Sequence, residues 1–293
     1  MRKIENPYGE LTGGRWMRGN LHTHTTRSDG KRSPQAVIDD YAARGYGFLM
    51  LSDHDIYSAS EPFDEFNCHG MLLIPGNEIS ANGPHMLHVH ADRLLIPHPQ
   101  RQRILNEAAA ARGFIIVCHP NWQEHFNHCP FERLSEWLGY AGMEIYNGVI
   151  NWLDGNPYAT DKWDMLLARG RRMWGFANDD SHKGDQDVEM GWNTVYVRDA
   201  TVPGVVDAML RGRFYPSTGV SITGIRVDGD RIGIETADAQ RIVAIQQTGR
   251  WFSSAAGPAI EIQVPKDASY VRFECFGAGG RMAWTQPFFI GGE

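Results

Sequence analysis

Short runs of apolar residues alternate with segments of helical periodicity through most of this 293-residue chain. The runs are apolar at nearly every position, which is typical of strands that are covered on both faces. They predict strands within residues 18–25, 46–54, 71–78, 85–90, 114–120, 142–148, 173–182 and 194–197.

The segments between these runs predict helices, most of which a glycine ends. Ser33 offers an N-cap, Pro34 suits the first helical position, and Gly45 ends this helix. Further helices are predicted within residues 101–112, 131–138, 161–169 and 202–210. Strands that alternate with helices indicate βαβ units and a parallel sheet, and enough such units close into a barrel.

From about Thr223 the pattern changes to short alternating runs separated by glycine, proline and aspartate. This pattern favours a small antiparallel β appendage, sandwich-like in form, that packs on the barrel. We therefore expect two domains, residues 1–222 and 223–293. The hydrophobic ending, with Trp284, Phe288 and Phe289, is predicted to lie against the outer surface of the barrel.

Nearly every predicted strand ends in histidine, aspartate or glutamate. Such barrels build their active sites at the carboxyl ends of the strands. In a pleated strand His22 and His24 point to one face, and the same spacing would bring Asp180 and His182 together. Imidazole and carboxylate groups in such a cluster suit zinc, manganese or iron. The strand ends carry His22, His24, His54, Glu78, His119, Glu144, Asp180 and His182.

Over residues 18–220 the chain resembles the PHP family (polymerase and histidinol phosphatase). The resemblance implies an α/β fold: a distorted (β/α)7 TIM-like barrel of the PHP type that holds up to three metals, here with the small C-terminal β appendage. It rests on several short motifs in the right order: His22-Thr-His24, Ser28-Asp29-Gly30, Ser52-Asp53-His54, Gly76-Asn-Glu78, Cys118-His119-Pro120 and Asp180-Ser-His182.

The resemblance also implies a ligand set for two or three divalent ions (Zn, Mn or Fe). In the implied second site Glu78 is shared with the first metal, and Asp29 stands in the third site where some members have a histidine. For the second site only the resemblance favours His85 over His88 and His90, which share a strand face with each other. The implied ligands are His22, His24, Glu78 and Asp180 for the first metal, Glu78, His85 and His119 for the second, and Asp29, His54 and His182 for the third.

Other polar residues near the strand ends have simpler interpretations. Asp53 precedes His54 in a strand, so its side chain points to the opposite face. This favours a role for Asp53 as a hydrogen-bond acceptor that supports the ligands. Trp122, Asn121 and Asn147 follow strand ends and are candidates for shaping a fairly open substrate pocket. The remaining histidines have no strand-end context and are interpreted as surface or loop residues: His69, His98, His125 and His128.

Clustered cations of this kind activate a water that attacks in line on a phosphoester, so we expect a phosphoric ester hydrolase that acts on a small phosphorylated molecule and releases phosphate. Glu78 and Asp180 are the predicted catalytic carboxylates, and Arg27, Lys183 and Lys31 are candidates for binding the phosphate oxygens.

Two alternatives stay open. The first is an amidohydrolase-type C–N or C–O hydrolase, which is disfavoured because those enzymes bridge their metals with a carboxylated lysine and no lysine ends a core strand here. The second is a non-catalytic module that metals only stabilise.

Composition narrows the class of partner. The net charge of −7 and a pI near 5.9 argue against binding of duplex nucleic acid. No apolar run is long enough for a membrane span, and no secretory signal is apparent, so a cytoplasmic location is the expectation. The four cysteines lack Cys-x-x-Cys spacing and are expected to be free thiols. The oligomeric state is left open.

Overall fold

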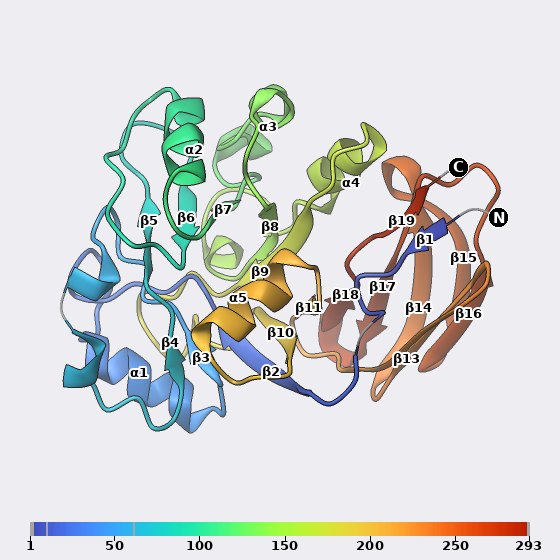
Figure 1. Cartoon of the computed structure of the whole chain (residues 1–293), viewed down its shortest axis with the longest axis horizontal. Helices are drawn as coiled ribbons and strands as arrows, with labels where there is room; N and C mark the ends of the chain where they lie inside the picture. Colours follow the sequence, from blue (N-terminus) through green and yellow to red (C-terminus); the bar gives the residue numbers. More distant parts are fainter. Residues whose placement is uncertain (1–2, 10, 61, 292–293) are drawn as a thin grey trace.

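The computed structural model describes residues 3–9, 11–60 and 62–291, and it has a mixed α/β fold. Figure 1 shows the helices on the left around short strands, and a β-rich region on the right formed by the C-terminal residues. Within the described ranges no helix combines the length and apolar character that a membrane span requires.

Two hydrogen-bonded sheets form the α/β region. Isolated parallel bridges between Thr23 and Ser181 and between His54 and Glu78 join them. The first sheet contributes β2 (Arg15–Asn20), β3 (Phe48–Leu49), β4 (Leu72–Leu73), β10 (Trp192–Val197) and β11 (Phe214–Ser217). The second consists of β5 (Gly76–Ile79), β6 (Met86–Val89), β7 (Phe114–Val117), β8 (Gly142–Asn147) and β9 (Trp174–Asn178).

The prediction of a parallel sheet holds only in part. Strands β2, β3 and β4 are parallel, as are β7, β8 and β9. Strand β6 is antiparallel to both neighbours, and β10 is antiparallel to β2 and β11. The connection from β5 to β6 is too short for a crossover, so these strands form a hairpin.

Among the described residues, five α-helices flank the sheets (Figure 1). The predicted N-cap is present, since the Ser33 side chain accepts a hydrogen bond from the backbone N–H of Ala36. The helices at residues 101–109 and 131–136 end before the glycine predicted to end each of them. The second ends early because the backbone of Trp137 is extended (ψ 144°) and its ring is buried. The α-helices are α1 (Pro34–Ala43), α2 (Arg101–Ala109), α3 (Phe131–Glu136), α4 (Thr160–Ala168) and α5 (Val202–Leu210). Short 3-10 turns are η1 (Ser58–Ser60), η2 (Phe63–Glu65), η3 (Glu124–Phe126), η4 (Val149–Trp152), η5 (Gln247–Gly249) and η6 (Ala278–Gly280).

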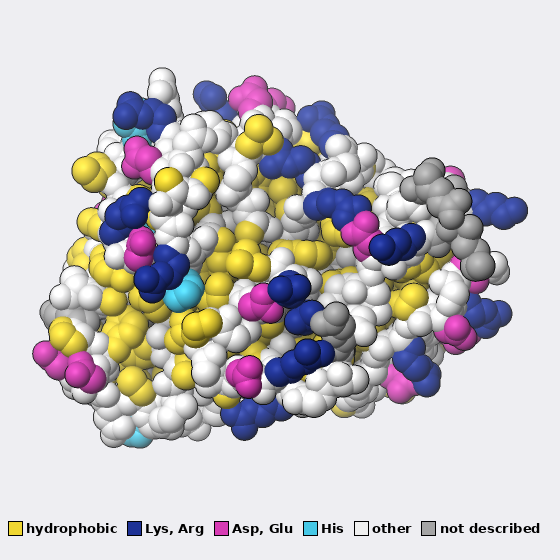
Figure 2. Space-filling view, viewed as in Figure 1, with side chains coloured by type: hydrophobic (Ala, Val, Ile, Leu, Met, Phe, Trp, Pro, Cys, Tyr) yellow, Lys and Arg dark blue, Asp and Glu magenta, His cyan; other side chains and the backbone are white. Residues whose placement is uncertain are grey.

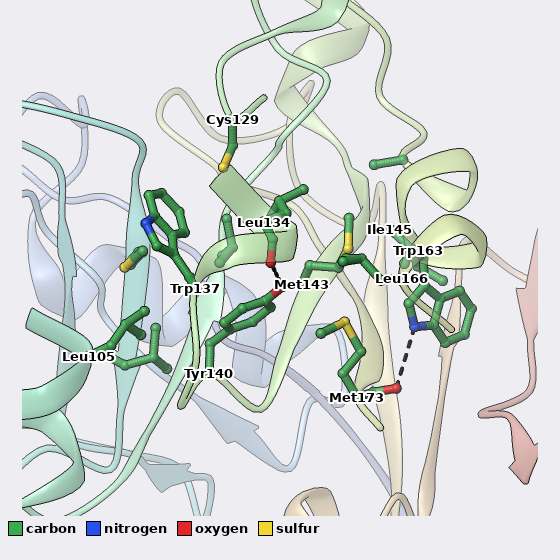
Figure 3. Close-up of a cluster of buried hydrophobic side chains, with 14 of the residues drawn as sticks. Leu105, Cys129, Leu134, Trp137, Tyr140, Met143, Ile145, Trp163, Leu166 and Met173 are labelled. Carbon is green, nitrogen blue, oxygen red and sulfur yellow. Dashed lines mark hydrogen bonds between the residues drawn. The ribbon is translucent and has the colours of Figure 1, made fainter. Parts of the chain in front are cut away.

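Part of the hydrophobic core lies between α3, α4 and the second sheet (Figure 3). Two polar groups in it find backbone partners: the Tyr140 hydroxyl donates to the carbonyl of Leu134 (2.6 Å), and the Trp163 indole donates to Met173 (3.4 Å). The aromatic side chains of Tyr140 and Trp163 are therefore buried with their donors paired.

The β-rich region is antiparallel, as the sequence pattern predicts. A three-stranded sheet of β12 (Ile222–Asp228), β13 (Arg231–Thr236) and β16 (Ala259–Gln263) shares one apolar core with strands of the larger sheet. The larger sheet contributes β14 (Ala239–Gln246), β15 (Arg250–Ala256), β17 (Tyr270–Gly277), β18 (Met282–Trp284), β19 (Phe288–Gly291) and the N-terminal β1 (Lys3–Glu5).

The division into residues 1–222 and 223–293 stays a prediction, and strand pairs of the larger sheet cross it. Strand β1 pairs with β19, and Ser217 of β11 pairs with Ala283 of β18. Termini 1–2 and 292–293 lie outside the described residues.

The hydrophobic ending packs differently from the prediction at one residue. Trp284 and Phe289 belong to the core beside α3 and α4, which agrees with contact to the α/β region. Phe288, by contrast, points into the core of the β-rich region. Neighbouring strand residues face opposite sides, so Phe288 and Phe289 cannot share one surface.

Charged side chains of both signs are interspersed on the molecular face seen in Figure 2. The four cysteines are free thiols, as expected.

Candidate metal centre

The strand ends bring the predicted ligands together. His22 and His24 follow β2, and their backbone is paired with the segment after β9: the Asp180 N–H donates to the carbonyl of His22, and the His24 N–H donates to Ser181. The parallel bridge between His54 and Glu78 brings the next two groups alongside. Four separate segments of the chain therefore meet at one point.

The four residues implied for a first metal are buried and mutually close. The Nε2 atoms of His22 and His24 lie 3.2 and 3.1 Å from the same oxygen, Oδ1 of Asp180. They lie 3.4 Å from the two carboxylate oxygens of Glu78. All four side chains point at a common space of the size that one cation fills.

The Glu78 carboxylate lies between this group and the next. Its Oε1 is 2.9 Å from Nδ1 of His85 and 3.4 Å from Nε2 of His119. Its Oε2 is 2.7 Å from Nδ1 of His54. A carboxylate surrounded in this way is placed to be shared between neighbouring cations.

The residues implied for a third metal lie nearest the solvent. Oδ2 of Asp29 is 3.4 Å from Nε2 of His182 and 3.6 Å from Nε2 of His54. The Asp29 side chain is 55% exposed, whereas His24, at the base of this group, is buried.

Unsatisfied atoms test whether cations fit here. Within the described residues, several buried atoms of the cluster make no hydrogen bond, although a buried polar atom without a partner is costly. The Glu144 carboxylate occupies Nδ1 of His22, which leaves the Nε2 lone pair facing the cluster. The residues therefore fit divalent cations. The unpaired atoms are Nε2 of His22 and His24, Nδ1 of His54, Oε2 of Glu78 and Oδ1 of Asp180.

The pKa values of these groups show how strongly they interact. Burial would raise the pKa of Glu78, but His22 and His85 hold it well below its usual value. Burial opposes protonation of His54 and His182, yet hydrogen bonds to Asp29 outweigh it and raise their pKa to about 10 and about 9. Histidine protons thus neutralise the carboxylates in the protein alone, and bound cations would replace those protons.

Asp180 and His182 converge by a route that the strand pattern did not predict. Strand β9 ends at Asn178, and Asp180 has a left-handed backbone (φ 57°), so no regular strand continues through the pair. Asp179 faces away from the ligands and accepts a hydrogen bond from Tyr41. A strained backbone of this kind persists where surrounding contacts hold it.

Of the three histidines that compete in the hairpin, His85 alone lies in the cluster. His88 is buried on the far side and pairs with the backbone carbonyl of Arg112 (2.9 Å). His90 belongs to none of the metal-type clusters among the described residues.

We expect His85→Ala to lower the metal content by about one ion per chain, because it removes an imidazole beside Glu78. His88→Ala is the matched control and should keep the full content, since its ring pairs with the Arg112 carbonyl and belongs to none of the metal-type clusters among the described residues. Elemental analysis of both purified variants measures this, and loss of metal in His88→Ala alone would move the ligand to that histidine.

The structure assigns Glu144 a larger part than sequence reasoning did. Glu144 lies within β8 and is buried, and the sequence marked it only as a strand-end acid. Oε1 accepts from His22 Nδ1 (2.8 Å) and from Asn178 (2.9 Å), and Oε2 accepts from the His119 backbone N–H and from Asn147 (both 2.8 Å). Only the tertiary structure places these four donors around one carboxylate.

Glu144→Gln should lower metal affinity about 10- to 100-fold. The amide NH2 would face donors where the carboxylate accepted, so His22 loses its orientation while the volume stays the same. Competition with a chelator measures the affinity, and the same change at the exposed Glu132 is the control. Equal affinity in Glu144→Gln and the wild type would show that His22 needs no such support.

His128 is not the ordinary loop residue that the sequence suggested. Its Nε2 accepts a hydrogen bond from the His85 backbone N–H (3.0 Å), and its ring lies 4.9 Å from that of His119. Burial, with the charges of His119 and His85, lowers the pKa of His128 to about 2, so it stays a neutral acceptor. Sequence gave no signal, because His128 follows no strand. The other three histidines in that class lie outside the cluster: His69 pairs with Asp39, His98 with residues of its own loop and helix, and His125 is exposed.

The remaining predicted residues divide into two groups. Asp53 accepts from Thr25 and Ser28, consistent with a supporting role behind His24. Asn121 is buried and donates to Tyr158 and Asp161, away from the ligands. The residues that border the ligands are Trp122, by its ring contacts, and Asn147, which donates to Asp180.

The three predicted phosphate-binding cations differ in position. Lys31 and Lys183 line the cavity above the cluster. Arg27 is not among its lining residues; its guanidinium donates to the carbonyl of Ser58 and lies 5.6 Å from the Phe66 ring centre.

Comparison with known proteins relates this geometry to a family. No family model matches the sequence. A two-domain protein from Bacteroides vulgatus, described as containing a predicted PHP-like metal-dependent phosphoesterase, aligns over 94% of this chain and 95% of its own, with a TM-score of 0.59 and 17% identity.

Two 5′-3′ exoribonucleases called Rnm match over a shorter stretch. The Escherichia coli protein is 37% identical over 98 residues, which is 32% of this chain and 33% of Rnm. The Salmonella typhimurium protein is 34% identical over 105 residues, or 33% and 36% of the two chains. This chain thus matches about a third of each relative's length. The structural match over nearly the whole chain confirms the resemblance: the protein has the fold of the PHP-like metal-dependent phosphoesterases.

Proposed function

We propose that this protein is a metal-dependent hydrolase that cleaves small phosphorylated molecules and releases phosphate. The observation that carries the proposal is the buried Glu78 carboxylate, which lies within 3.4 Å of imidazole nitrogens from His22, His85 and His119. Two or three divalent ions (Zn, Mn or Fe) in this cluster would acidify water and neutralise phosphate charge. The fold and the motif order support the phosphoester class.

Each group of residues has a distinct task in this proposal. His22, His24, Glu78 and Asp180 hold one cation, His85 and His119 complete a second site with Glu78, and Asp29, His54 and His182 form a third. Glu144 and Asp53 fix the orientation of the ligands. Lys31 and Lys183 at the cavity rim bind phosphate oxygens and orient the substrate.

The amidohydrolase alternative finds little support in the lysines. Lys162 is buried, but its Nζ donates to the carbonyls of Pro120, Phe126 and Cys129. Lys31 and Lys183 are exposed. None of these three lysines therefore takes the position of Glu78, where a carboxylated lysine would have to bridge the metals.

A second candidate function is hydrolysis of short single-stranded RNA, and the matches to the two Rnm exoribonucleases favour it. It is a phosphodiesterase activity and would use the same cluster. The net charge of −7 still disfavours long duplexes.

Turnover of a panel of phosphomonoesters and diesters, with and without added manganese, tests the proposal, with inorganic phosphate measured for the monoesters and the released alcohol or monoester measured for the diesters. A 5′-phosphorylated oligoribonucleotide in the same panel tests the second candidate, and carboxylic esters and amides test the amidohydrolase alternative. Manganese-dependent turnover of monoesters supports the first function. Turnover of carboxylic esters or amides without turnover of any phosphoester contradicts the phosphoesterase function.

Metal content provides an independent prediction. Protein purified without chelator should carry two or three transition-metal ions per chain, because the converging ligands exceed what one ion can use. Elemental analysis with protein quantified by amino-acid analysis measures the ratio. A ratio of one or below would contradict a multinuclear centre.

We also propose that the two sheets of the α/β region act as one distorted (β/α)7 barrel. The support is the pair of bridges, Thr23 with Ser181 and His54 with Glu78, which join the sheets where the ligands lie.

A further inference from the structure

A cavity of about 400 Å³ opens over the candidate metal centre. His54, His85, His119 and His182 form its floor with Asp180. Its volume is within the range of small-molecule sites. Its walls differ from each other in chemical character.

One wall is apolar and combines two loops. Trp122 follows β7, and the other side chains come from η4 and the residue after it: Val149, Ile150, Trp152 and Leu153. Trp152 is 62% exposed and Leu153 is 48% exposed. Exposed apolar groups that border a polar site are typical of a ligand-binding surface.

Backbone hydrogen bonds hold the two loops together. The Gln123 N–H donates to the carbonyl of Asp154 (2.9 Å), and the Asn156 N–H donates to the carbonyl of Asn121 (2.9 Å). Gly155 lies between them in a bridge to Trp122, and a Cβ at Gly155 would come within 2.9 Å of the Trp122 Cα. The loops that carry Trp122 and Trp152 are therefore joined by their backbones into one structural unit.

Contacts with two histidine rings also hold the Trp122 side chain in place. Its ring centre lies 4.8 Å from that of His128 and 5.1 Å from that of His119, nearly perpendicular to the latter at 85°. A tryptophan that packs on a candidate ligand cannot move far from the metal centre. An aromatic group bound beside it would lie close to the reacting phosphate.

The cavity is also lined by two lysines and by the carboxylates of Asp29 and Asp187. Lys31 and Lys183 line it, and the Lys31 N–H donates to the carbonyl of His182, which keeps their loops adjacent. In the part of the chain that the structure describes, neither lysine forms an ion pair within 4.0 Å. Their charge is available to a phosphate at the floor of the cavity.

Resting on the proposed phosphoesterase function, we propose that the substrates are phosphoesters with a planar aromatic or heteroaromatic group, which lies against Trp122 and Trp152. The phosphate lies over the histidine floor near the lysines. Flat rings gain from offset or edge-on contact with tryptophan beyond the burial of area. A compact sugar phosphate would leave this wall uncovered.

Phenylphosphonate and cyclohexylphosphonate form a matched pair of probes. They share the anionic group and have similar size, differ in planarity, and cannot be hydrolysed as esters. Isothermal titration calorimetry on the protein as purified should give about 5-fold tighter binding of phenylphosphonate. Trp152→Ala and Trp152→Leu should both reduce this preference towards one, because leucine retains apolar area without a ring.

Trp251→Ala is the control, since Trp251 is exposed on β15 in the β-rich region. It should keep the preference. Equal binding of the two probes by the wild type overturns the proposal, as does a preference unchanged in both Trp152 variants. Sedimentation of Trp152→Ala tests whether the wall is an interface with a second copy. A changed association state with an unchanged preference also overturns the proposal.

The phosphoester panel separates this inference from the proposed function. Turnover without any aromatic preference in binding rejects the aromatic wall and keeps the phosphoesterase. Aromatic preference in binding with no phosphoester turned over rejects the phosphoesterase and leaves the wall as a ligand site.

Discussion

Glu78→Gln is expected to lower phosphoester turnover by at least about 100-fold and to reduce the bound metal, while the protein keeps its fold. The Glu78 side chain is fully buried, and its two oxygens lie 2.7–3.4 Å from nitrogens of five histidines. A neutral amide fits the same space but cannot balance the charge of two cations. It also presents an NH2 group where ligand atoms are needed.

Glu261→Gln is the matched control, because it makes the same atomic change at an exposed position on β16. Three measurements separate the causes: turnover, elemental analysis and circular dichroism. Loss of metal and turnover with an unchanged spectrum is the expected result. Near wild-type turnover in Glu78→Gln would show that this carboxylate is not shared between metals.

Arg272→Met is expected to destabilise the protein by about 3–5 kcal/mol. Arg272 of β17 is 1% exposed and reaches across to Asp164 of α4, with Nε–Oδ1 and Nη2–Oδ2 distances of 2.8 and 2.5 Å. Its Nη1 also donates to Glu274 (2.8 Å). Methionine would leave the Asp164 carboxylate buried without its cation, with the Tyr270 hydroxyl as its remaining donor among the described side chains.

The double variant Arg272→Met with Asp164→Leu should recover much of this loss, because it removes the unpaired charge as well. Arg226→Met is the control, since Arg226 and Glu235 form an ion pair at the surface, where such pairs contribute little. Urea unfolding, followed by tryptophan fluorescence and circular dichroism, measures the midpoints. A midpoint for Arg272→Met equal to that of the control would show that this pair does not hold the two regions together.

The ligand positions illustrate what local sequence could predict. Apolar runs that end in His22, Glu78, His119 and Asp180 predict a shared edge of polar groups, because strand ends of one sheet meet in space. The structure places these residues together. These four members of the candidate site were thus visible in the sequence because each lies near the end of a strand, whereas Asp29 and His85 do not follow one.

Residues that meet through loops and hairpins were not predictable in this way. His128 comes from a loop without any periodic signal, and Glu144 acquires three of its four donors from other segments of the chain. The antiparallel β6 reads in sequence like any other buried strand, since its apolar pattern does not depend on direction. Its short connection to β5 decides its direction.

By itself the sequence determined the alternation of strands and helices, the caps, the antiparallel tail and the order of the metal-type motifs. These depend on neighbours along the chain, where periodicity and capping act. Only the tertiary structure decided that Phe288 turns into the β-rich core, that Arg272 pairs with Asp164, and that Trp122 and Trp152 form one wall. The physical reason is that packing and ion pairing join residues far apart in sequence, and no local pattern records the partner.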